Sequence, residues 1–377
     1  MKKIGIIGSF SGTNIGDTIV LETILKYFSQ KDDSLEFYIP TYNKNFIENY
    51  FSSYNIKGID ITLRSLSMRF FGFGSIKNLM KCDIIVTTAG ICFDKKILNF
   101  RYNFIISLLP VLFIMKLIRK KIFGLCIGVI KPESKLGEFI MKNYIGLHDE
   151  IILRNPQDKT VLEKFGYENF SVSSDIVFIN DTKYQGIKNI KNSRKKKIAI
   201  NLTGSLYNSN KGDISGKICD VISEYIESNN DAYFYLIPTS KGDMAFNQSI
   251  YNLLPESGKG NVEIIPFYKY NSNEVNTLLQ ECDYVIGMRM HSLILALINN
   301  VPVISLDYSP KVTGLMHQFN IIEYSINISK DINILNINLL QDISKKLEED
   351  ARLRKRLESE MREIKGDILH RLDQINY

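Results

Sequence analysis

Motifs that hold metal ions or nucleotides are missing from this sequence. It has no HExxH, no DxD pair and no group of carboxylates at metal-ligand spacing. The glycine loop at residues 8–17 is not GxGxxG, and it lacks the Lys-Ser/Thr pair of a P-loop. The five cysteines form no CxxC pair, which favours buried reduced thiols over disulfides or metal ligands. A metal-dependent reaction is therefore not indicated, and we expect no bound metal and no cofactor.

A secretory signal and a membrane-spanning segment are also lacking. The chain passes from Met1 directly into an apolar run at residues 4–8, with no long apolar core or small-residue cleavage site. The apolar stretch at residues 104–118 is shorter than the ~20 residues that span a bilayer, and Pro110 interrupts it. We therefore expect a cytoplasmic protein. Tryptophan is absent too, which we interpret as a compositional bias without functional meaning.

Positive charge is concentrated in one region. The whole chain has a net charge of +6, whereas residues 57–142 alone contain 15 Lys/Arg and 5 Asp/Glu. Here the apolar stretch 104–118 is followed by Arg119-Lys120-Lys121. One interpretation is a buried crossover helix that ends in a basic turn. The other is peripheral association with an anionic membrane at its inner face, or contact with a lipid-linked substrate. Nucleic acid is not an expected partner, because the basic region contains no recognisable nucleic-acid-binding motif.

Short apolar runs alternate with helix-like segments along most of the chain. The runs lie at residues 4–8, 35–39, 83–88, 121–127 and 150–153, and then at 198–202, 232–237, 262–265, 284–286 and 303–306. This alternation favours parallel strands joined by crossover helices. We predict an α/β protein with two doubly wound, Rossmann-like domains that face each other across a cleft.

A polar and basic segment separates the two series of runs. We predict a first domain at residues 1–182, a linker at 183–197, a second domain at 198–334 and a charged helical tail at 335–377. A chain of 377 residues has the length of two moderate domains. In doubly wound sheets, ligands bind at the carboxyl ends of the strands, where helix N-termini point outward.

The first candidate site is the opening loop at residues 8–17, between the first strand and a helix. Its backbone amides could hold an anion or a sugar hydroxyl. Asp17 could equally be a carboxylate that caps the helix or compensates its dipole.

Two further junctions carry cationic side chains. At residues 285–293 an apolar strand ends, and Arg289 and His291 precede a helix. A cation at a helix N-terminus is unfavourable unless an anion lies there too, so Arg289 is a candidate anion ligand. Lys311 starts the helix after the run at 303–306, at the same sheet edge. It is either a second anion ligand or a solvated lysine.

These residues and their spacing resemble the polysaccharide pyruvyl transferase family. The most specific match is Arg289-Met290-His291-Ser292-Leu293, followed by an apolar helix and then by Pro302, Tyr308 and Lys311-Val312. Asn14-Ile15-Gly16-Asp17 matches the family's opening N-x-G-D, while Arg154 and Asp175 stand in weaker matches. The chain departs from the family at residues 88–90 and 124–129, where glycine motifs are reduced, and this departure concerns acceptor recognition.

The resemblance implies a two-domain fold like that of the GT-B glycosyltransferases. It implies transfer of the pyruvyl group of phosphoenolpyruvate to two hydroxyls of one sugar, which forms a cyclic ketal in a cell-surface glycan or a lipid-linked oligosaccharide. The second domain would bind phosphoenolpyruvate through Arg289, Met290, Ser292 and Lys311, together with Arg154 of the first domain. The implied catalytic residues are His291 and Asp17. The implied acceptor contacts are Asn14, Gly16 and Asp17.

Two other functions remain open. A glycosyltransferase of the same fold would use Arg289 and Lys311 to bind the diphosphate of a nucleotide sugar. A non-catalytic partner in polysaccharide assembly would fit the reduced glycine motifs. Such a partner would have no need of Arg289, His291 and Lys311 together.

Overall fold

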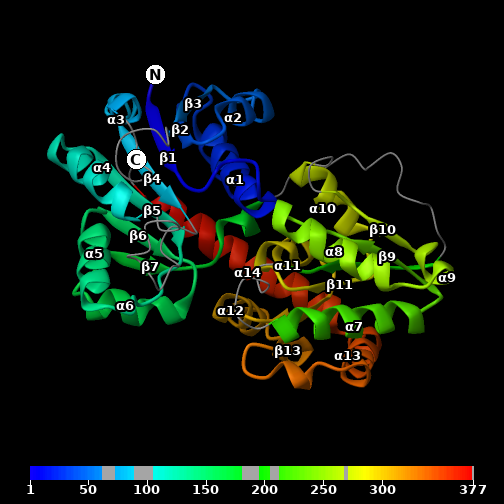
Figure 1. Cartoon of the computed structure of the whole chain (residues 1–377). Coiled ribbons are helices and arrows are strands. Elements are labelled where there is room, and N and C mark those ends of the chain that lie inside the picture. Colours follow the sequence, from blue (N-terminus) through cyan, green and yellow to red (C-terminus); the bar gives the residue numbers. More distant parts are fainter. Residues whose placement is uncertain (62–72, 89–104, 181–194, 204–211, 267–270, 376–377) are drawn as a thin grey trace. The chain divides into compact units, whose positions relative to one another are not determined.

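The computed structural model describes residues 1–61, 73–88, 105–180, 195–203, 212–266 and 271–375 (Figure 1). The chain divides into two compact units. Unit 1 comprises Met1–Thr13, Asp17–Ile179 and Ile364–Tyr377, whereas unit 2 comprises Asn14–Gly16 and Asn180–Glu363. Most of the linker predicted at 183–197 lies outside the described residues. The tail predicted from residue 335 is helical, and its residues are divided between the two units.

Unit 1 is built on a seven-stranded sheet in the order β3-β2-β1-β4-β5-β6-β7, with every pair parallel. The strands are β1 (Lys3–Ile7), β2 (Glu36–Thr41), β3 (Ile56–Asp60), β4 (Ile84–Thr88), β5 (Lys121–Ile127), β6 (Glu150–Leu153) and β7 (Phe170–Val172). The helices between them are α1 (Ile15–Lys31), α2 (Lys44–Tyr50), α3 (Phe73–Leu79), α4 (Ile105–Leu117), α5 (Lys135–Gly146) and α6 (Lys159–Lys164). Central strands such as β4 are buried along their whole length, as expected for a parallel sheet covered on both faces.

Unit 2 contains a six-stranded sheet in the order β10-β9-β8-β11-β12-β13, again wholly parallel. The strands are β8 (Lys196–Asn201), β9 (Ala232–Leu236), β10 (Val262–Ile264), β11 (Tyr284–Gly287), β12 (Val303–Asp307) and β13 (Ser325–Asn327). The helices are α7 (Gly212–Ser228), α8 (Lys241–Leu253), α9 (Glu256–Lys259), α10 (Ser272–Gln280), α11 (Met290–Ile298), α12 (Pro310–Gln318) and α13 (Ile337–Glu349). The last helix, α14 (Leu353–Gln374), begins in unit 2, and its residues from Ile364 onward are counted with unit 1. The predicted fold class, two parallel α/β sheets with crossover helices, is confirmed.

The strand order of unit 2 changes direction between β8 and β11. The chain moves from β8 outward to β9 and β10, and then returns to β11 on the other side of β8. In doubly wound sheets, the carboxyl ends of two such strands flank the usual ligand position. Asn201 of β8 is in register with Gly287 of β11, which in turn is in register with Ser305 of β12. The residues after these three positions therefore share one edge of the sheet.

The apolar stretch 104–118 forms α4 from Ile105 onward. Its inner face is packed in the core of unit 1 through Leu108, Val111, Leu112 and Met115. The interpretation of this stretch as a crossover helix is therefore confirmed for the side of α4 that is buried in the core. No helix in the described part of the chain has the length and hydropathy required to cross a membrane.

Four of the five cysteines fall within the described residues, and all four are buried free thiols. Burial raises the pKa of the Cys82 thiol to about 12 and that of Cys219 to about 11, so both are protonated at neutral pH. Cys92 lies outside the described residues. Among the residues that the structure describes, no three His, Cys, Asp or Glu side chains gather as a metal site.

Candidate active site

The junction between β11 and α11 places the predicted Arg289 and His291. Arg289 has an extended backbone and caps α11 through its carbonyl oxygen, which accepts from the amide of Ser292 at 3.0 Å. A Cβ carbon on Gly287 would lie 2.6 Å from a methyl carbon of Leu293. Glycine at the end of β11 therefore lets the first turn of α11 fold back closely on the strand.

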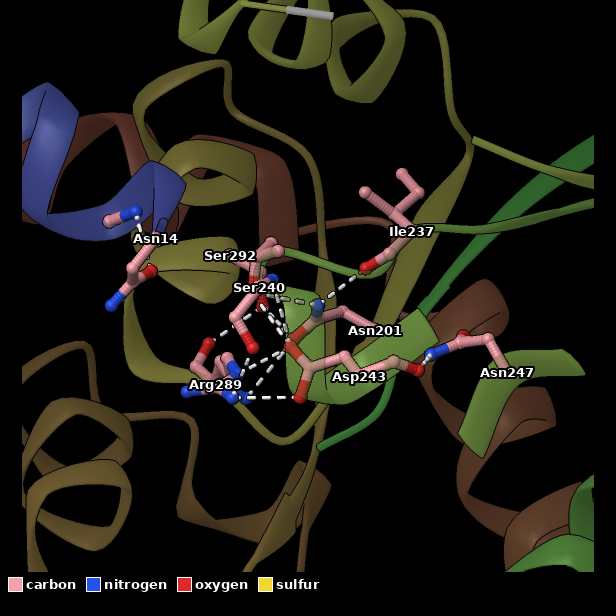
Figure 2. Close-up of polar contacts among 10 residues, drawn as sticks. Asn14, Asn201, Ile237, Ser240, Asp243, Asn247, Arg289 and Ser292 are labelled. Carbon is pink, nitrogen blue, oxygen red and sulfur yellow. Dashed lines mark hydrogen bonds and ion pairs between the residues drawn. The ribbon is translucent and has the colours of Figure 1, made fainter. Parts of the chain in front are cut away.

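Arg289 is fixed by a buried carboxylate. Its Nε and Nη2 donate to the two oxygens of Asp243 at 2.8 and 2.7 Å, and Nη2 also donates to the Ser240 hydroxyl at 2.9 Å (Figure 2). The Asp243 side chain has no exposed surface, and that of Arg289 is 21% exposed. This two-point geometry sets the plane of the guanidinium. The sequence had indicated an anion beside Arg289, and the structure supplies one from the protein.

Asp243 itself is held at the start of α8. Its Oδ2 accepts from the backbone amide of Ser240 at 3.1 Å, as in a capping box. The Asp243 carboxylate thus stabilises the helix N-terminus and orients Arg289 at once. The Ser-x-x-Asp pattern could have been recognised in the sequence as a helix start, but no spacing rule connects it with a residue 46 positions later.

Asn201, which sequence reasoning missed, connects three loops at the switch point. Its side-chain amide donates to the Ile237 carbonyl at 2.6 Å. Its carbonyl oxygen accepts from the Arg289 amide at 3.2 Å and from the Ser292 hydroxyl at 2.7 Å (Figure 2). Asn201 is 1% exposed, so its side chain is shielded from water. The only signal in the sequence was a polar residue at the end of an apolar strand.

The opening motif meets the second motif within unit 2. Ile15 donates its amide to the Thr239 carbonyl at 3.0 Å, and Asn14 forms an antiparallel bridge with Ser240. The Asn14 side chain accepts from the Gly16 amide at 3.0 Å and so caps α1. A Cβ carbon on Gly16 would lie 2.3 Å from Nδ1 of His291 and 2.9 Å from its Cγ. The absence of a side chain at residue 16 is therefore what lets the imidazole lie here.

The third junction, between β12 and α12, carries Tyr308 and Lys311. Lys311 is the second residue of α12, after Pro310, and is half-buried. Burial raises the pKa of the Tyr308 hydroxyl, and the charge of Arg289 opposes that shift. Tyr308 is therefore protonated at neutral pH and can donate a hydrogen bond. Asp307, also buried, accepts from the Ser309 amide at 3.0 Å and orders the turn.

The remaining predicted residues have different surroundings. Ser292 is 2% exposed and its hydroxyl is bonded within the protein, whereas Met290 is half-buried at the start of α11. Asp17 lies half-buried in the first turn of α1, counted with unit 1. Arg154, also in unit 1, forms a 2.8 Å ion pair with Asp175 in which both side chains are at most 4% exposed.

Unit 2 thus brings together most of the predicted site, and unit 1 holds Asp17 and Arg154. The structure groups Asn14, Gly16, Arg289, Met290, His291, Ser292 and Lys311 in unit 2. The roles assigned to all nine residues stay predictions.

Solved structures define the class of this fold. A UDP-GlcNAc 2-epimerase from Methanocaldococcus jannaschii matches with a TM-score of 0.61 at 12% identity, over 93% of this chain and 94% of that one. The Neisseria meningitidis UDP-GlcNAc 2-epimerase bound to UDP-GlcNAc gives 0.61 at 12% identity, over 98% and 100%. A ugt transferase from Siraitia grosvenorii in complex with UDP gives 0.57 at 9% identity, over 99% of each chain. The protein therefore has the GT-B fold of these epimerases and glycosyltransferases.

The sequence defines the family. A model of the polysaccharide pyruvyl transferase family matches residues 14–310. The chain belongs to the polysaccharide pyruvyl transferases. No curated protein sequence matches it.

Proposed function

We propose that this protein transfers the pyruvyl group of phosphoenolpyruvate to two hydroxyls of one sugar and forms a cyclic ketal. The acceptor would be a cell-surface polysaccharide or its lipid-linked precursor. The observation that supports this proposal best is the packing of Gly16 against His291, beside the pair of Arg289 and Asp243. That packing joins the family's opening motif to its most specific one at the carboxyl edge of one sheet.

The donor is proposed to bind at the N-termini of α11 and α12. Phosphoenolpyruvate carries a phosphate and a carboxylate, so its site needs several positive groups. Arg289 keeps Nη1 without a hydrogen bond to any described residue, and this nitrogen can donate two bonds to an anion. The N-cap residue of α11 makes no capping bond through its side chain, and a helix N-terminus favours a bound anion. Lys311 adds a further cation at α12.

The pairing with Asp243 decides how Arg289 can act. The carboxylate cancels the net charge of the guanidinium. Arg289 therefore orients the bound anion by hydrogen bonding and adds little net electrostatic attraction. A guanidinium held in one plane recognises a phosphate or carboxylate with defined geometry. The net positive charge that attracts the phosphate and carboxylate of the donor would then come from Lys311 and from the helix N-termini.

The proposed reaction requires one proton to be gained at C3 of the donor and one to be lost from each of the two sugar hydroxyls, the second of which leaves with the phosphate. Protonation of C3 makes C2 electrophilic, and a sugar hydroxyl adds to C2 as it loses its proton. The C2–O bond to phosphate then breaks, and the second hydroxyl attacks C2, loses its proton and closes the ketal ring. An imidazole can donate or accept these protons near neutral pH, and we assign that role to His291. Asp17, the residue after Gly16, is assigned to the acceptor hydroxyl.

The proposal is tested by phosphate release from phosphoenolpyruvate in the presence of acceptor sugars. We expect release to depend on the acceptor and to be abolished by His291→Ala with little change in melting temperature. His317→Ala, an exposed histidine of α12, is the matched control and should retain full activity. The proposal fails if phosphoenolpyruvate neither binds the protein nor raises its melting temperature.

A nucleotide-sugar enzyme is the second candidate, and the GT-B fold favours it. The Neisseria meningitidis epimerase was solved with UDP-GlcNAc, and the ugt transferase was solved with UDP. A thermal-shift comparison of phosphoenolpyruvate with UDP-sugars separates the two candidates. A non-catalytic role in polysaccharide assembly would instead be indicated by normal polysaccharide in cells that carry His291→Ala.

A further inference from the structure

The outward face of α4 in unit 1 is apolar. Ile106, Pro110, Phe113 and Leu117 follow one another at spacings of four, three and four, which places them along one side of the helix. Phe113 is 53% exposed and Leu117 is 66% exposed. The opposite side is packed in the core, and Lys116 is the one charged residue of the helix. A helix that is apolar all round is normally buried all round, and α4 is not.

Helix α5 extends this apolar face. It packs beside α4, as Figure 1 shows, and it exposes Leu136 by 57% and Phe139 by 64%. Its flank towards α6 is polar, because Glu138 pairs there with Lys164 at 3.1 Å. Single exposed apolar side chains are ordinary, but large ones gathered on neighbouring helices mark an interaction surface.

Cationic residues border these side chains. Arg119 follows the end of α4, and Lys135 and Lys142 lie on α5, and all three are exposed. Each makes no ion pair with any described residue. We call Phe113, Leu117, Leu136 and Phe139, with these three cations, the α4–α5 surface. Apolar side chains bordered by free cations match the chemistry of an anionic lipid surface.

The turn after α4 sets the backbone position of Arg119. The Arg119 amide donates to the Lys116 carbonyl and the Lys120 amide to the Met115 carbonyl, both at 2.9 Å, which is a Schellman motif. Arg119 occupies its left-handed position with a φ of 62°. Glycine is favoured at such a position, so a side chain is held there against its conformational preference. The turn fixes Arg119 next to the exposed Leu117.

We propose that the α4–α5 surface docks unit 1 on a bilayer that contains anionic phospholipids. Docking would be interfacial, because α4 has 13 residues and is only ~20 Å long, whereas a bilayer core is ~30 Å thick. A second copy of the chain is a poorer partner for this surface, because a symmetric contact would bring Arg119, Lys135 and Lys142 of both copies close together. The inference goes beyond the proposed pyruvyl transfer and does not rest on it.

The test is sedimentation of the full chain with vesicles of phosphatidylcholine, with or without phosphatidylglycerol. We expect binding to the anionic vesicles, weakened by added salt, and little binding to the neutral ones. The double variant Phe113→Asp/Phe139→Asp should lose this binding. Leu253→Asp, at an apolar residue of α8 that is 54% exposed, is the matched control and should bind as wild type does.

The cationic rim is tested by separate variants. Lys135→Gln and Lys142→Gln should each weaken binding to the anionic vesicles by about fivefold, the effect of one cation at a charged membrane surface. Lys345→Gln on α13, where the lysine pairs with Glu349, is the matched control. Arg119→Gly should weaken binding while raising the melting temperature, because glycine suits the left-handed turn. A loss of binding in that variant is therefore not a loss of folding.

Three results would overturn the proposal. The first is a wild-type protein that does not bind anionic vesicles, and the second is a Phe113→Asp/Phe139→Asp variant that binds as strongly as wild type. Sedimentation velocity could also show a dimer that the double variant abolishes, which would make the surface a contact between copies. We expect the double variant to keep full activity on a soluble acceptor sugar, so failure here is distinct from failure of the proposed function.

Discussion

Gly16 lies so close to His291 that a Cβ carbon at residue 16 would stand 2.3 Å from Nδ1 of the imidazole. The two residues belong to different motifs, 275 positions apart in the chain. Gly16 is required here for space, because it lies in the first turn of α1 without a left-handed backbone. The glycine of the opening motif therefore determines where the histidine of the second motif can lie.

The first prediction is that Gly16→Ala displaces His291 and removes activity without unfolding the protein. Alanine is a better helix former than glycine, so the steric conflict with His291 is the main cost. A displacement of about 1 Å in a reacting group can reduce the rate about 100-fold. We expect a fall of that order in kcat/KM for phosphoenolpyruvate, measured by phosphate release, with a nearly unchanged melting temperature.

Gly366→Ala is the control for this substitution. Gly366 is exposed on α14, and a Cβ carbon there would meet nothing within 4 Å. We expect it to stabilise the protein by about 0.5–1 kcal/mol and to leave activity unchanged. Full activity in Gly16→Ala would show that this contact does not position the histidine.

The second prediction concerns the ion pair of Asp243 and Arg289. Asp243→Ala leaves a mostly buried guanidinium without its carboxylate, and we expect the free energy of unfolding to fall by about 3 kcal/mol. The freed guanidinium should also rotate, which weakens phosphoenolpyruvate binding. Urea denaturation and a binding titration measure the two effects.

Two further variants test whether the pair acts as a unit. Asp342→Ala removes an exposed carboxylate of α13 and should change stability by less than about 0.5 kcal/mol. The double variant Arg289→Ala/Asp243→Ala should lose less stability than the sum of the single variants, because neither charge is left alone. Additive losses would contradict the pairing.

The sequence predicted the fold and the motifs, but not the contacts between them. Runs such as 121–127 and 150–153 coincide with β5 and β6, because buried parallel strands are continuous apolar segments. The short edge strands β3, β7 and β13 were missed, since edge strands carry polar residues and their pairing is set by the neighbouring strand. In the site, Arg289 and His291 were found from local spacing.

Asp243 and Asn201 could not be found in that way. They lie 46 and 88 positions from Arg289, and only the parallel sheet brings the ends of β8, β9 and β11 to one edge. The sequence argument that Arg289 needs an anion was physically sound. It assigned that anion to the substrate, whereas a buried protein carboxylate occupies one side of the guanidinium.

The third prediction is that Asn201→Ala loosens the donor site. The substitution removes the partners of the Ile237 carbonyl and the Arg289 amide, and one of the two acceptors of the Ser292 hydroxyl. We expect a loss of about 2 kcal/mol in the free energy of unfolding, because buried polar groups are left unsatisfied. The Asn201 side chain is buried and bonded to the loops that carry Arg289 and Ser292, so KM for phosphoenolpyruvate should rise more than kcat falls. Asn252→Ala, exposed on α8, should alter neither quantity.

The fourth prediction is a loss of stability in mild acid that arises from His148. Its Nδ1 donates to the Tyr144 carbonyl at 3.0 Å, and its Nε2 accepts from the Thr87 hydroxyl at 2.8 Å. Burial lowers the pKa of His148 from 6.5 to about 4, against the opposing effect of the backbone carbonyls. Between these values the unfolded chain binds a proton that the folded protein excludes. Stability should therefore fall as the pH drops from about 6.5 to about 4, by about 3 kcal/mol in total.

Chemical denaturation at a series of pH values measures this effect. His148→Gln should be less stable than wild type at pH 7, because it disturbs a buried network, but it should lack the part of the acid-induced loss that His148 causes. His317→Gln should keep the wild-type pH dependence, since that residue is exposed on α12. If wild type and His148→Gln lost stability in parallel between pH 6.5 and 4, the destabilising proton would have to bind elsewhere. The neutral, buried state of His148 would then not be what limits stability in acid.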